Sequence, residues 1–183
     1  MTRIAQLLGC AGVAAFVWGA WIPAKAVAAQ VLIAHAWQEA RAGKANPKPW
    51  SWADTWPIAR LEAPTLGRAA FVLAGASGQA MAFGPGHVSS TAMPGERGNI
   101  VIAGHRDTHF AFLAELSIGD PIILEGPTTS TRYLVRETAV LHETQTEILE
   151  PSTVSQLTLI TCFPFDAVAP GGPLRYVVRA AAY

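Results

Sequence analysis

The stretch QLTLITCFPFDAVAPGGPLRYVV, residues 156–178, contains two apolar runs separated by a loop rich in proline and glycine. The first run, 157–161, leads directly to Cys162, and the second run, 174–178, has Arg175 at its start. Short apolar runs bounded by turn residues are typical of buried strands. The stretch therefore predicts two β-strands, one carrying a thiol and the other a guanidinium at the ends that border the loop.

The same pattern recurs along the chain from residue 58 onward. Short apolar runs rich in Val, Ile and Leu alternate with turns rich in Gly and Pro, and only a few short stretches look helical. The apolar runs are 58–61, 69–73, 100–103, 122–124, 132–135, 139–141, 157–160 and 174–178, and the helical stretches lie around 79–83, 110–116 and 147–154. About eight short strands with little helix between them predict an all-β domain, a mostly antiparallel barrel or sandwich.

The N-terminal part of the chain has a different composition. Residues 4–22 contain no charged side chain, and about 20 helical residues are enough to cross the hydrocarbon core of a bilayer. Trp18 and Trp21 lie at the far end of this run, as aromatic residues do at a membrane interface. We therefore predict an N-terminal transmembrane helix, with a secretory signal cleaved within 24–29 as the alternative.

The segment between this run and the strands has two parts. Residues 26–41 have apolar side chains at helical spacing and predict an amphipathic continuation of the helix, whereas 46–57 combines three prolines with three tryptophans and predicts an extended linker. The predicted domains are a transmembrane anchor at 1–25, an amphipathic helix and linker at 26–57, and a catalytic β-barrel domain at 58–183.

Charge and cysteine usage narrow the functional classes. Residues 1–45 hold four of the 13 Lys and Arg and one of the 13 Asp and Glu, so nine basic and twelve acidic side chains remain in the rest of the chain. No basic stripe suggests a nucleic-acid partner, and we expect none. Once Cys10 is assigned to the membrane run, Cys162 has no partner for an intramolecular disulfide. Such a thiol is reactive, pairs with another chain, or is buried and inert.

A second informative stretch is NIVIAGHRDTHF, residues 99–110, in which an apolar run ends in Gly104 and is followed by His105. A thiol and an imidazole exchange protons in overlapping pH ranges, so together they generate a thiolate and protonate a leaving amine. The fixed donors of Arg175 can hold a carbonyl or an oxyanion. Each of these residues alone has an ordinary structural explanation, but His105, Cys162 and Arg175 in combination predict acyl-transfer catalysis.

Three motifs carry a resemblance to a known family. AGHRD at 103–107, TLITC at 158–162 and LRYVV at 174–178 stand in the order and spacing of the sortase motifs, and residues 56–183 resemble the sortases, the membrane-anchored cysteine transpeptidases of bacterial surfaces. The wording GHRDTHF and the N-terminal WIPAKA segment are most similar to the class GN sortases of proteobacteria. The resemblance implies a closed eight-stranded sortase-type β-barrel with short helices.

The resemblance also implies catalytic roles. Cys162 is expected to attack the carbonyl after a Thr-like residue of an LPxTG-like C-terminal sorting signal, forming a thioester acyl-enzyme. His105 is expected to protonate the departing amine and then to deprotonate the incoming one. Arg175 is expected to steady the substrate backbone and the oxyanion, and Thr161 to contribute a substrate contact to the same groove. His109 is interpreted as a residue that orients the histidine loop.

The implied setting is the bacterial inner membrane, with a single pass and an extracytoplasmic catalytic domain. The expected partners are a substrate protein bearing the sorting signal, an unidentified amine acceptor, and membrane lipid around the N-terminal helix. No cofactor is expected. We also predict no metal, because the loops offer only an incomplete set of acidic ligands: Glu96, Glu143, Glu147 and Glu150.

Two other functions remain compatible with the residues. One is another envelope Cys/His peptidase or acyl transferase, such as an L,D-transpeptidase, although that class places its cysteine shortly after a Ser-His-Gly cluster and Cys162 follows Leu-Ile-Thr. The other is a non-catalytic, membrane-tethered β-barrel that binds a partner protein. This second function predicts a buried and unreactive Cys162.

Overall fold

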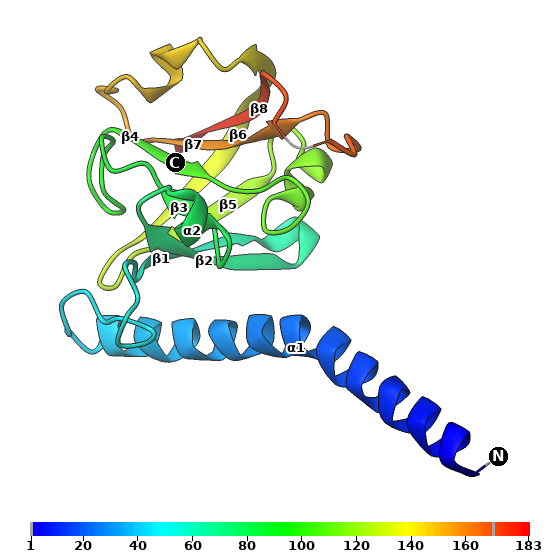
Figure 1. Cartoon of the computed structure of the whole chain (residues 1–183). Coiled ribbons are helices and arrows are strands. Elements are labelled where there is room, and N and C mark those ends of the chain that lie inside the picture. Colours follow the sequence, from blue (N-terminus) through cyan, green and yellow to red (C-terminus); the bar gives the residue numbers. More distant parts are fainter. Residues whose placement is uncertain (1, 170) are drawn as a thin grey trace.

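The computed structural model describes residues 2–169 and 171–183, with backbone only at residues 2–18, 20, 22 and 23. One long helix precedes a set of eight strands joined by short helices (Figure 1). The elements are α1 (Thr2–Arg41), β1 (Pro57–Ala63), η1 (Pro64–Leu66), β2 (Arg68–Ala74), α2 (Gly78–Met81), β3 (Gly86–His87), β4 (Asn99–Ala103), η2 (Ala111–Glu115), β5 (Pro121–Glu125), β6 (Ser130–His142), η3 (Thr146–Leu149), β7 (Gln156–Phe163) and β8 (Leu174–Ala182).

The strands close into a barrel in the order β1-β2-β3-β4-β7-β8-β6-β5. Two neighbouring pairs, β2 with β3 and β4 with β7, are parallel, and the other pairs are antiparallel. Closure gives every strand two neighbours and so leaves few unpaired backbone groups, although a long strand beside a short one keeps some residues unpaired. The prediction of a closed eight-stranded barrel is confirmed, and of the two shapes that the strand pattern allowed, barrel and sandwich, the chain adopts the barrel.

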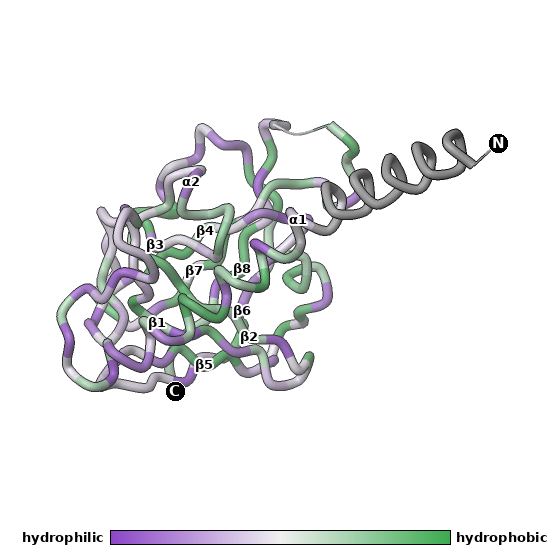
Figure 2. The backbone as a smooth tube through the Cα atoms, turned by 60° about the horizontal axis from the view of Figure 1, so that its bottom comes forward, coloured by the Kyte–Doolittle hydropathy of each residue, from purple (hydrophilic) through white to green (hydrophobic). Residues whose placement is uncertain are grey.

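Alternating side chains fill the barrel interior. Along β7, Leu157 and Leu159 point into the core, and the neighbouring strand β4 contributes Ile100 and Ile102 to the same cluster. All four side chains are fully buried. The strands that converge on this core are the most hydrophobic parts of the tube in Figure 2. A core of this kind supplies the main favourable free energy of folding and holds the strand ends in fixed positions.

Two strands differ from the sequence prediction. The apolar runs 132–135 and 139–141 belong to one strand, β6, which stays paired with β8 through a register irregularity between Val135 and Glu137. The polar residues at this irregularity made one strand look like two. Conversely, β3 is only two residues long, and it carries no apolar run that a sequence pattern could reveal.

Helix α1 packs along β1 and β2 through its second half (Figure 1). Ile33, Ala36 and Trp37 are buried, and the Trp37 ring lies 6.3 Å from the Phe71 ring of β2. The opposite side of the helix is also apolar, because Val27 and Val31 are exposed. Residues 26–41 are therefore helical as part of α1, with one face docked on the barrel and exposed apolar side chains on the other.

The predicted membrane span at residues 4–22 lies almost entirely on residues whose side chains are not described. Where side chains are described, no helix is both long and apolar enough to cross a membrane. The linker after α1 lies on the barrel surface: the Thr55 hydroxyl donates to the carbonyl of Ala74 at 2.8 Å, and the Trp50 ring meets Phe83 edge-on at 5.0 Å. Trp52, by contrast, is 83% exposed.

Candidate active site

Cys162 and Arg175 are cross-strand partners. Cys162 lies one residue before the end of β7, and its partner in the antiparallel ladder is Arg175, the second residue of β8. Directly opposite residues of an antiparallel pair point to the same face of the sheet. Leu157 and Leu159 of β7 point inward, so strand alternation directs the Cys162 thiol to the outer face. Both side chains are partly exposed.

His105 reaches the same end of the barrel from the other side of β7. Strand β4 runs parallel to β7 with Ala103 opposite Ile160, and the Gly104 N–H donates to the Ile160 carbonyl at 3.0 Å. His105 follows Gly104. Extending the Ala103–Ile160 register by two residues places His105 level with Cys162. The three residues predicted as catalytic therefore lie at one end of the barrel: Cys162 on β7, Arg175 on the neighbouring β8, and His105 two residues after the end of β4.

Gly104 allows the chain to turn tightly beside the core. A Cβ atom at this position would lie 2.9 Å from the ring of Phe110, which is fully buried under the loop 105–110. Contacts this short are essentially never formed by real side chains. The glycine of the AGHRD motif is therefore needed for the close approach of this loop to the barrel, and the loop in turn places His105.

Thr161 also positions the histidine loop. Its side chain is buried, and its hydroxyl donates to the carbonyl of Gly104 at 2.7 Å. This bond joins the residue before Cys162 to the residue before His105. The hydroxyl is thus engaged within the protein, and the substrate contact expected from Thr161 remains a prediction for its backbone groups.

Arg106 is a site residue that the sequence reading did not single out. Its side chain is buried and donates from Nη2 to the carbonyls of Ala167 and Ala169, both at 2.9 Å. These two carbonyls belong to the loop between β7 and β8. Arg106 therefore fastens the loop that separates Cys162 from Arg175 to the loop that carries His105. The only sequence signal was its place beside the histidine, because its partners are backbone atoms.

Arg175 is held by three hydrogen bonds. Its Nη1 donates to the carbonyls of Gly172 and Leu174 at 2.6 and 2.9 Å, and its Nη2 donates to the Glu143 carboxylate at 2.6 Å. A guanidinium has five N–H groups, so two of them remain free for another acceptor. Glu143 lies just after β6 and is one of the acidic loop residues that form the incomplete set of metal ligands. Its contact with Arg175 is not visible in any sequence motif.

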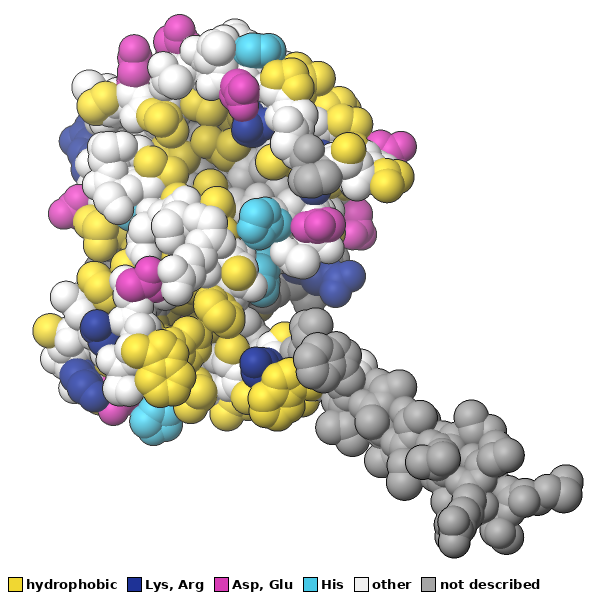
Figure 3. All heavy atoms as spheres, in the orientation of Figure 1, with side chains coloured by type: hydrophobic (Ala, Val, Ile, Leu, Met, Phe, Trp, Pro, Cys, Tyr) yellow, Lys and Arg dark blue, Asp and Glu magenta, His cyan; other side chains and the backbone are white. Residues whose placement is uncertain are grey.

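The space-filling view shows a hollow in the upper half of the barrel (Figure 3). Hydrophobic side chains form its floor, and charged side chains stand at its rim. Near the β7–β8 turn, the rings of Phe163, Phe165 and Tyr176 contact one another with centroids 5.2 to 6.3 Å apart. This aromatic cluster packs on the core through Phe165 and Tyr176 and supports the strand ends that carry Cys162 and Arg175.

Comparison with known proteins agrees with this architecture. The family model described as the Sortase domain matches residues 61–183, which is most of the chain. The chain belongs to the sortase family. Sortase D of Bacillus subtilis (strain 168) is 31% identical over 119 residues, covering 64% of this chain and 60% of the relative. This sortase thus spans less than two thirds of the length of that curated relative.

Solved structures give the same result. A Clostridium perfringens Sortase D5 transpeptidase matches with a TM-score of 0.63 and 28% identity, over 70% of this chain and 79% of that one. Sortase A from Corynebacterium diphtheriae matches with a TM-score of 0.65 and 29% identity, over 72% of this chain and 63% of that one. The family and fold predictions are confirmed, whereas the class GN assignment remains a prediction.

The sortase site contains a second histidine in a distinct environment. Burial lowers the pKa of His109, and the charge of nearby His105 lowers it further. His109 therefore favours its neutral form at neutral pH. It lines a cavity on the side of the loop that faces β2, together with Arg68.

The acidic residues of the loops are dispersed or engaged. Among the residues described, no group of three or more His, Cys, Asp or Glu side chains is arranged to hold a metal ion. Glu143 is paired with Arg175, and the backbone carbonyl of Glu150 accepts from the Asn99 amide at 3.2 Å. The residues of this segment thus contribute to the order of the site through contacts with the protein itself.

Proposed function

We propose that this sortase is a cysteine transpeptidase that uses Cys162, His105 and Arg175 as its catalytic residues. The observation that carries the proposal is the convergence of the three residues at one end of the barrel, on or just after adjacent strands. An inert structural cysteine is usually buried, whereas Cys162 is partly exposed. This exposure favours the catalytic function over the non-catalytic binding module.

The proposed reaction has two acyl-transfer steps. In the first, the Cys162 sulfur bonds to the scissile carbonyl carbon, the amide C–N bond breaks, and His105 gives its proton to the leaving amine. The free N–H groups of Arg175 donate to the substrate backbone and the oxyanion. In the second step, an incoming amine bonds to the thioester carbonyl, the C–S bond breaks, and His105 takes up the proton of the amine.

The proposed donor substrate is a protein with an LPxTG-like C-terminal sorting signal. This part of the proposal rests on family membership and on the TLITC and LRYVV motifs. An extended peptide in the groove would place the carbonyl after its Thr-like residue at Cys162, next to the donors of Arg175. Water competes with the amine for the same thioester, so hydrolysis is the expected side reaction.

We also propose that the chain is a single-pass inner-membrane protein whose barrel lies outside the cytoplasm. The uncharged run 4–22 supports this location, as do the exposed apolar side chains that follow it on α1. Trp21 and Trp52 are 60% and 83% exposed, and exposed tryptophan is typical of a membrane interface. Fractionation of cells with and without carbonate extraction, followed by protease access to the barrel, tests the location.

Acyl-enzyme trapping tests the catalytic proposal. The full-length protein is incubated with a panel of LPxTG-like peptides, and intact-mass spectrometry looks for acylation of Cys162. We expect a thioester adduct with wild type, none with Cys162→Ala, and a strongly reduced rate with His105→Ala. Transfer to an added amine identifies a transpeptidase, whereas hydrolysis alone at every amine concentration identifies a peptidase. Failure of the whole panel to acylate a folded protein would overturn the proposed activity.

A further inference from the structure

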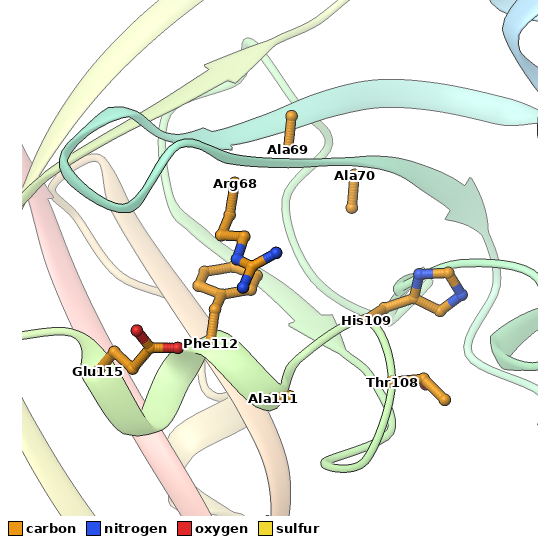
Figure 4. A pocket seen from close by; sticks show the side chains of 8 residues that line it. All are labelled: Arg68, Ala69, Ala70, Thr108, His109, Ala111, Phe112 and Glu115. Atoms are coloured by element: carbon orange, nitrogen blue, oxygen red, sulfur yellow. The ribbon is translucent and has the colours of Figure 1, made fainter.

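A cavity of about 260 Å³ lies beside the histidine loop, on the side away from Cys162 and Arg175. It is bounded by the start of β2 and by the segment from the histidine loop to the end of η2 (Figure 4). Its lining residues are Arg68, Ala69, Ala70, Thr108, His109, Ala111, Phe112 and Glu115. A water molecule occupies about 30 Å³ in the liquid, so the cavity has room for a small molecule such as an amino acid or dipeptide.

The polar side chains of this cavity are not used to hold the protein together. Arg68 and Glu115 face the same cavity, yet neither forms an ion pair with any residue that the structure describes. Arg68 and Ala70 project from β2 on the same side, Arg68 toward Phe112 of η2, and the small Ala70 side chain leaves the space beside it open (Figure 4). The cavity therefore offers a cation, an anion and the neutral imidazole of His109 to a ligand.

The strand order shows on which side of His105 this cavity lies, and therefore which of the two substrates it can bind. The barrel runs β2-β3-β4-β7-β8, so Cys162 and Arg175 lie on one side of β4 and the cavity lies on the other. His105 stands between them, two residues after the end of β4. The donor acyl group occupies the side of Cys162 and Arg175, and the incoming amine must give its proton to His105. The cavity is lined by His109, on the loop that carries His105, and the charge of His105 lowers the pKa of His109. An acceptor held there approaches His105 from the side opposite the donor acyl group.

Backbone groups in the cavity are also available. Within β2, strand β3 pairs only with Leu73 and Ala74, so the earlier residues of β2, 68–70, have no strand partner on the side of the cavity. On their other side these residues are paired with β1. An exposed strand edge can hydrogen-bond an extended peptide as an added strand. A short peptide segment is therefore better suited to this cavity than a simple alkyl amine.

We propose that this cavity is the acceptor subsite, and that it selects a peptide-like amine carrying a carboxylate, which Arg68 binds. The inference rests on the proposed transpeptidase function. In the transfer step, the acceptor nitrogen bonds to the acyl carbon, the bond to the Cys162 sulfur breaks, and the amine proton passes to His105 and from there to the sulfur. Glu115 attracts the ammonium form of the acceptor, which loses one proton to solvent water before the free amine attacks.

The test compares two acceptors that differ only in one charge. Full-length protein receives an LPxTG-like peptide that acylates it, together with glycylglycine or glycylglycinamide. We expect a clear preference for glycylglycine in kcat/KM for transfer. Arg68→Gln should raise the KM for glycylglycine about tenfold, as expected for loss of one charge-assisted contact, and leave hydrolysis of the acyl-enzyme unchanged. Arg132→Gln, which removes an exposed arginine from β6, is the matched control.

A steric variant and a binding measurement complete the test. Ala70→Leu fills the cavity without changing its charge, and it should slow transfer to both acceptors while sparing hydrolysis. Glycylglycine should shift the imidazole NMR signal of His109 in the unacylated protein, and glycylglycinamide should do so only at higher concentration. Equal use of the two acceptors, or equal behaviour of Arg68→Gln and Arg132→Gln, would overturn the subsite. Absence of any acyl-enzyme would instead reject the transpeptidase function, and the NMR titration would still decide the cavity.

Discussion

Cys162 lies directly opposite Arg175 in the β7–β8 ladder, one residue inside the end of each strand. Backbone pairing therefore fixes the spacing of the proposed nucleophile and a cation without the help of a flexible loop. A site on paired strands keeps its geometry more closely than one on loops. We therefore expect activity to depend on the planar guanidinium group at position 175, and not only on its positive charge.

Replacing Arg175 by lysine should remove most of the activity. Lysine keeps the positive charge but cannot present several N–H groups in one plane, so it cannot reproduce the contacts to Gly172 and Leu174 and still donate to substrate. Loss of one oxyanion donor costs about 10²–10³ in rate. We expect Arg175→Lys to approach Arg175→Ala in the rate of Cys162 acylation, measured by mass spectrometry. A lysine variant with nearly wild-type rates would contradict the proposed role.

Removing the Glu143 carboxylate should have a smaller effect on the rate of Cys162 acylation than replacing Arg175. It accepts from Arg175 at 2.6 Å, but half of its side-chain surface is exposed, and exposed ion pairs contribute only about 0–1 kcal/mol. We expect Glu143→Ala to lower kcat/KM by less than about fivefold, and the difference from wild type to shrink as salt is added. Glu143→Gln keeps an acceptor oxygen, so its kcat/KM should lie between those of wild type and Glu143→Ala. A salt-independent loss of several orders of magnitude would indicate a direct catalytic role for this carboxylate.

Arg106 should control the order of the β7–β8 loop. Its buried Nη2 holds the carbonyls of Ala167 and Ala169, and hydrogen bonds from charged groups contribute about 1.5–3 kcal/mol each. We expect Arg106→Met to increase amide hydrogen exchange in residues 165–169 and to slow acylation, while the barrel strands keep their protection. Arg97→Met is the control, because Arg97 is an exposed arginine that also binds a backbone carbonyl, that of Thr153. Unchanged exchange in the loop would contradict this role.

Asn99 should contribute to the stability of the fold and take no part in catalysis. Its buried amide donates to the carbonyls of Ile148 and Glu150, and its oxygen accepts from the Thr158 hydroxyl at 2.8 Å. Asn99→Ala leaves these groups unsatisfied, so we expect the free energy of unfolding to fall by about 2–3 kcal/mol in urea denaturation. Asn99→Asp should cost at least as much, because it sets a carboxylate against two carbonyl oxygens. A smaller loss with aspartate than with alanine would show that the amide N–H groups matter little.

The lowered pKa of His109 predicts a pH dependence of stability. In the unfolded chain the imidazole has its usual pKa of about 6.5, and in the fold the pKa lies below that value. The unfolded state therefore binds the proton first on acidification, so the contribution of neutral His109 is complete above about pH 6.5 and is lost as pH falls toward its folded pKa. The stability of wild type relative to His109→Gln should decrease as pH falls below about 6.5. A difference that does not change with pH would contradict the lowered pKa.

The sequence was a good guide to the strands and a poor guide to the contacts around the site. Apolar runs predicted most strands because burial on one face leaves a clear periodic signal, as in 157–160 and 100–103. Strand β3 was not predicted, since two residues carry no periodicity, and β6 was read as two strands because its irregularity near Glu137 is polar.

The candidate catalytic residues were identified from motifs, whereas their supports were not. Arg106 and Thr161 act through the backbone carbonyls of Ala167, Ala169 and Gly104, and a carbonyl leaves no trace in a residue pattern. The ion pair of Glu143 with Arg175 joins positions 32 residues apart. Such pairings depend on how loops fold over the barrel, which a single sequence does not encode in any local signal.

The parallel pairing of β4 with β7 also bears on when the thiol becomes reactive. The bond between Thr161 and Gly104 joins residues 57 positions apart, and contacts between distant segments form late because a long loop must close first. An unfolded chain has no fixed imidazole or guanidinium beside its thiol. On the proposed mechanism, Cys162 thus gains its partners only when folding is complete, which protects bystander peptides from premature cleavage and makes enzymatic competence itself a reporter of correct assembly.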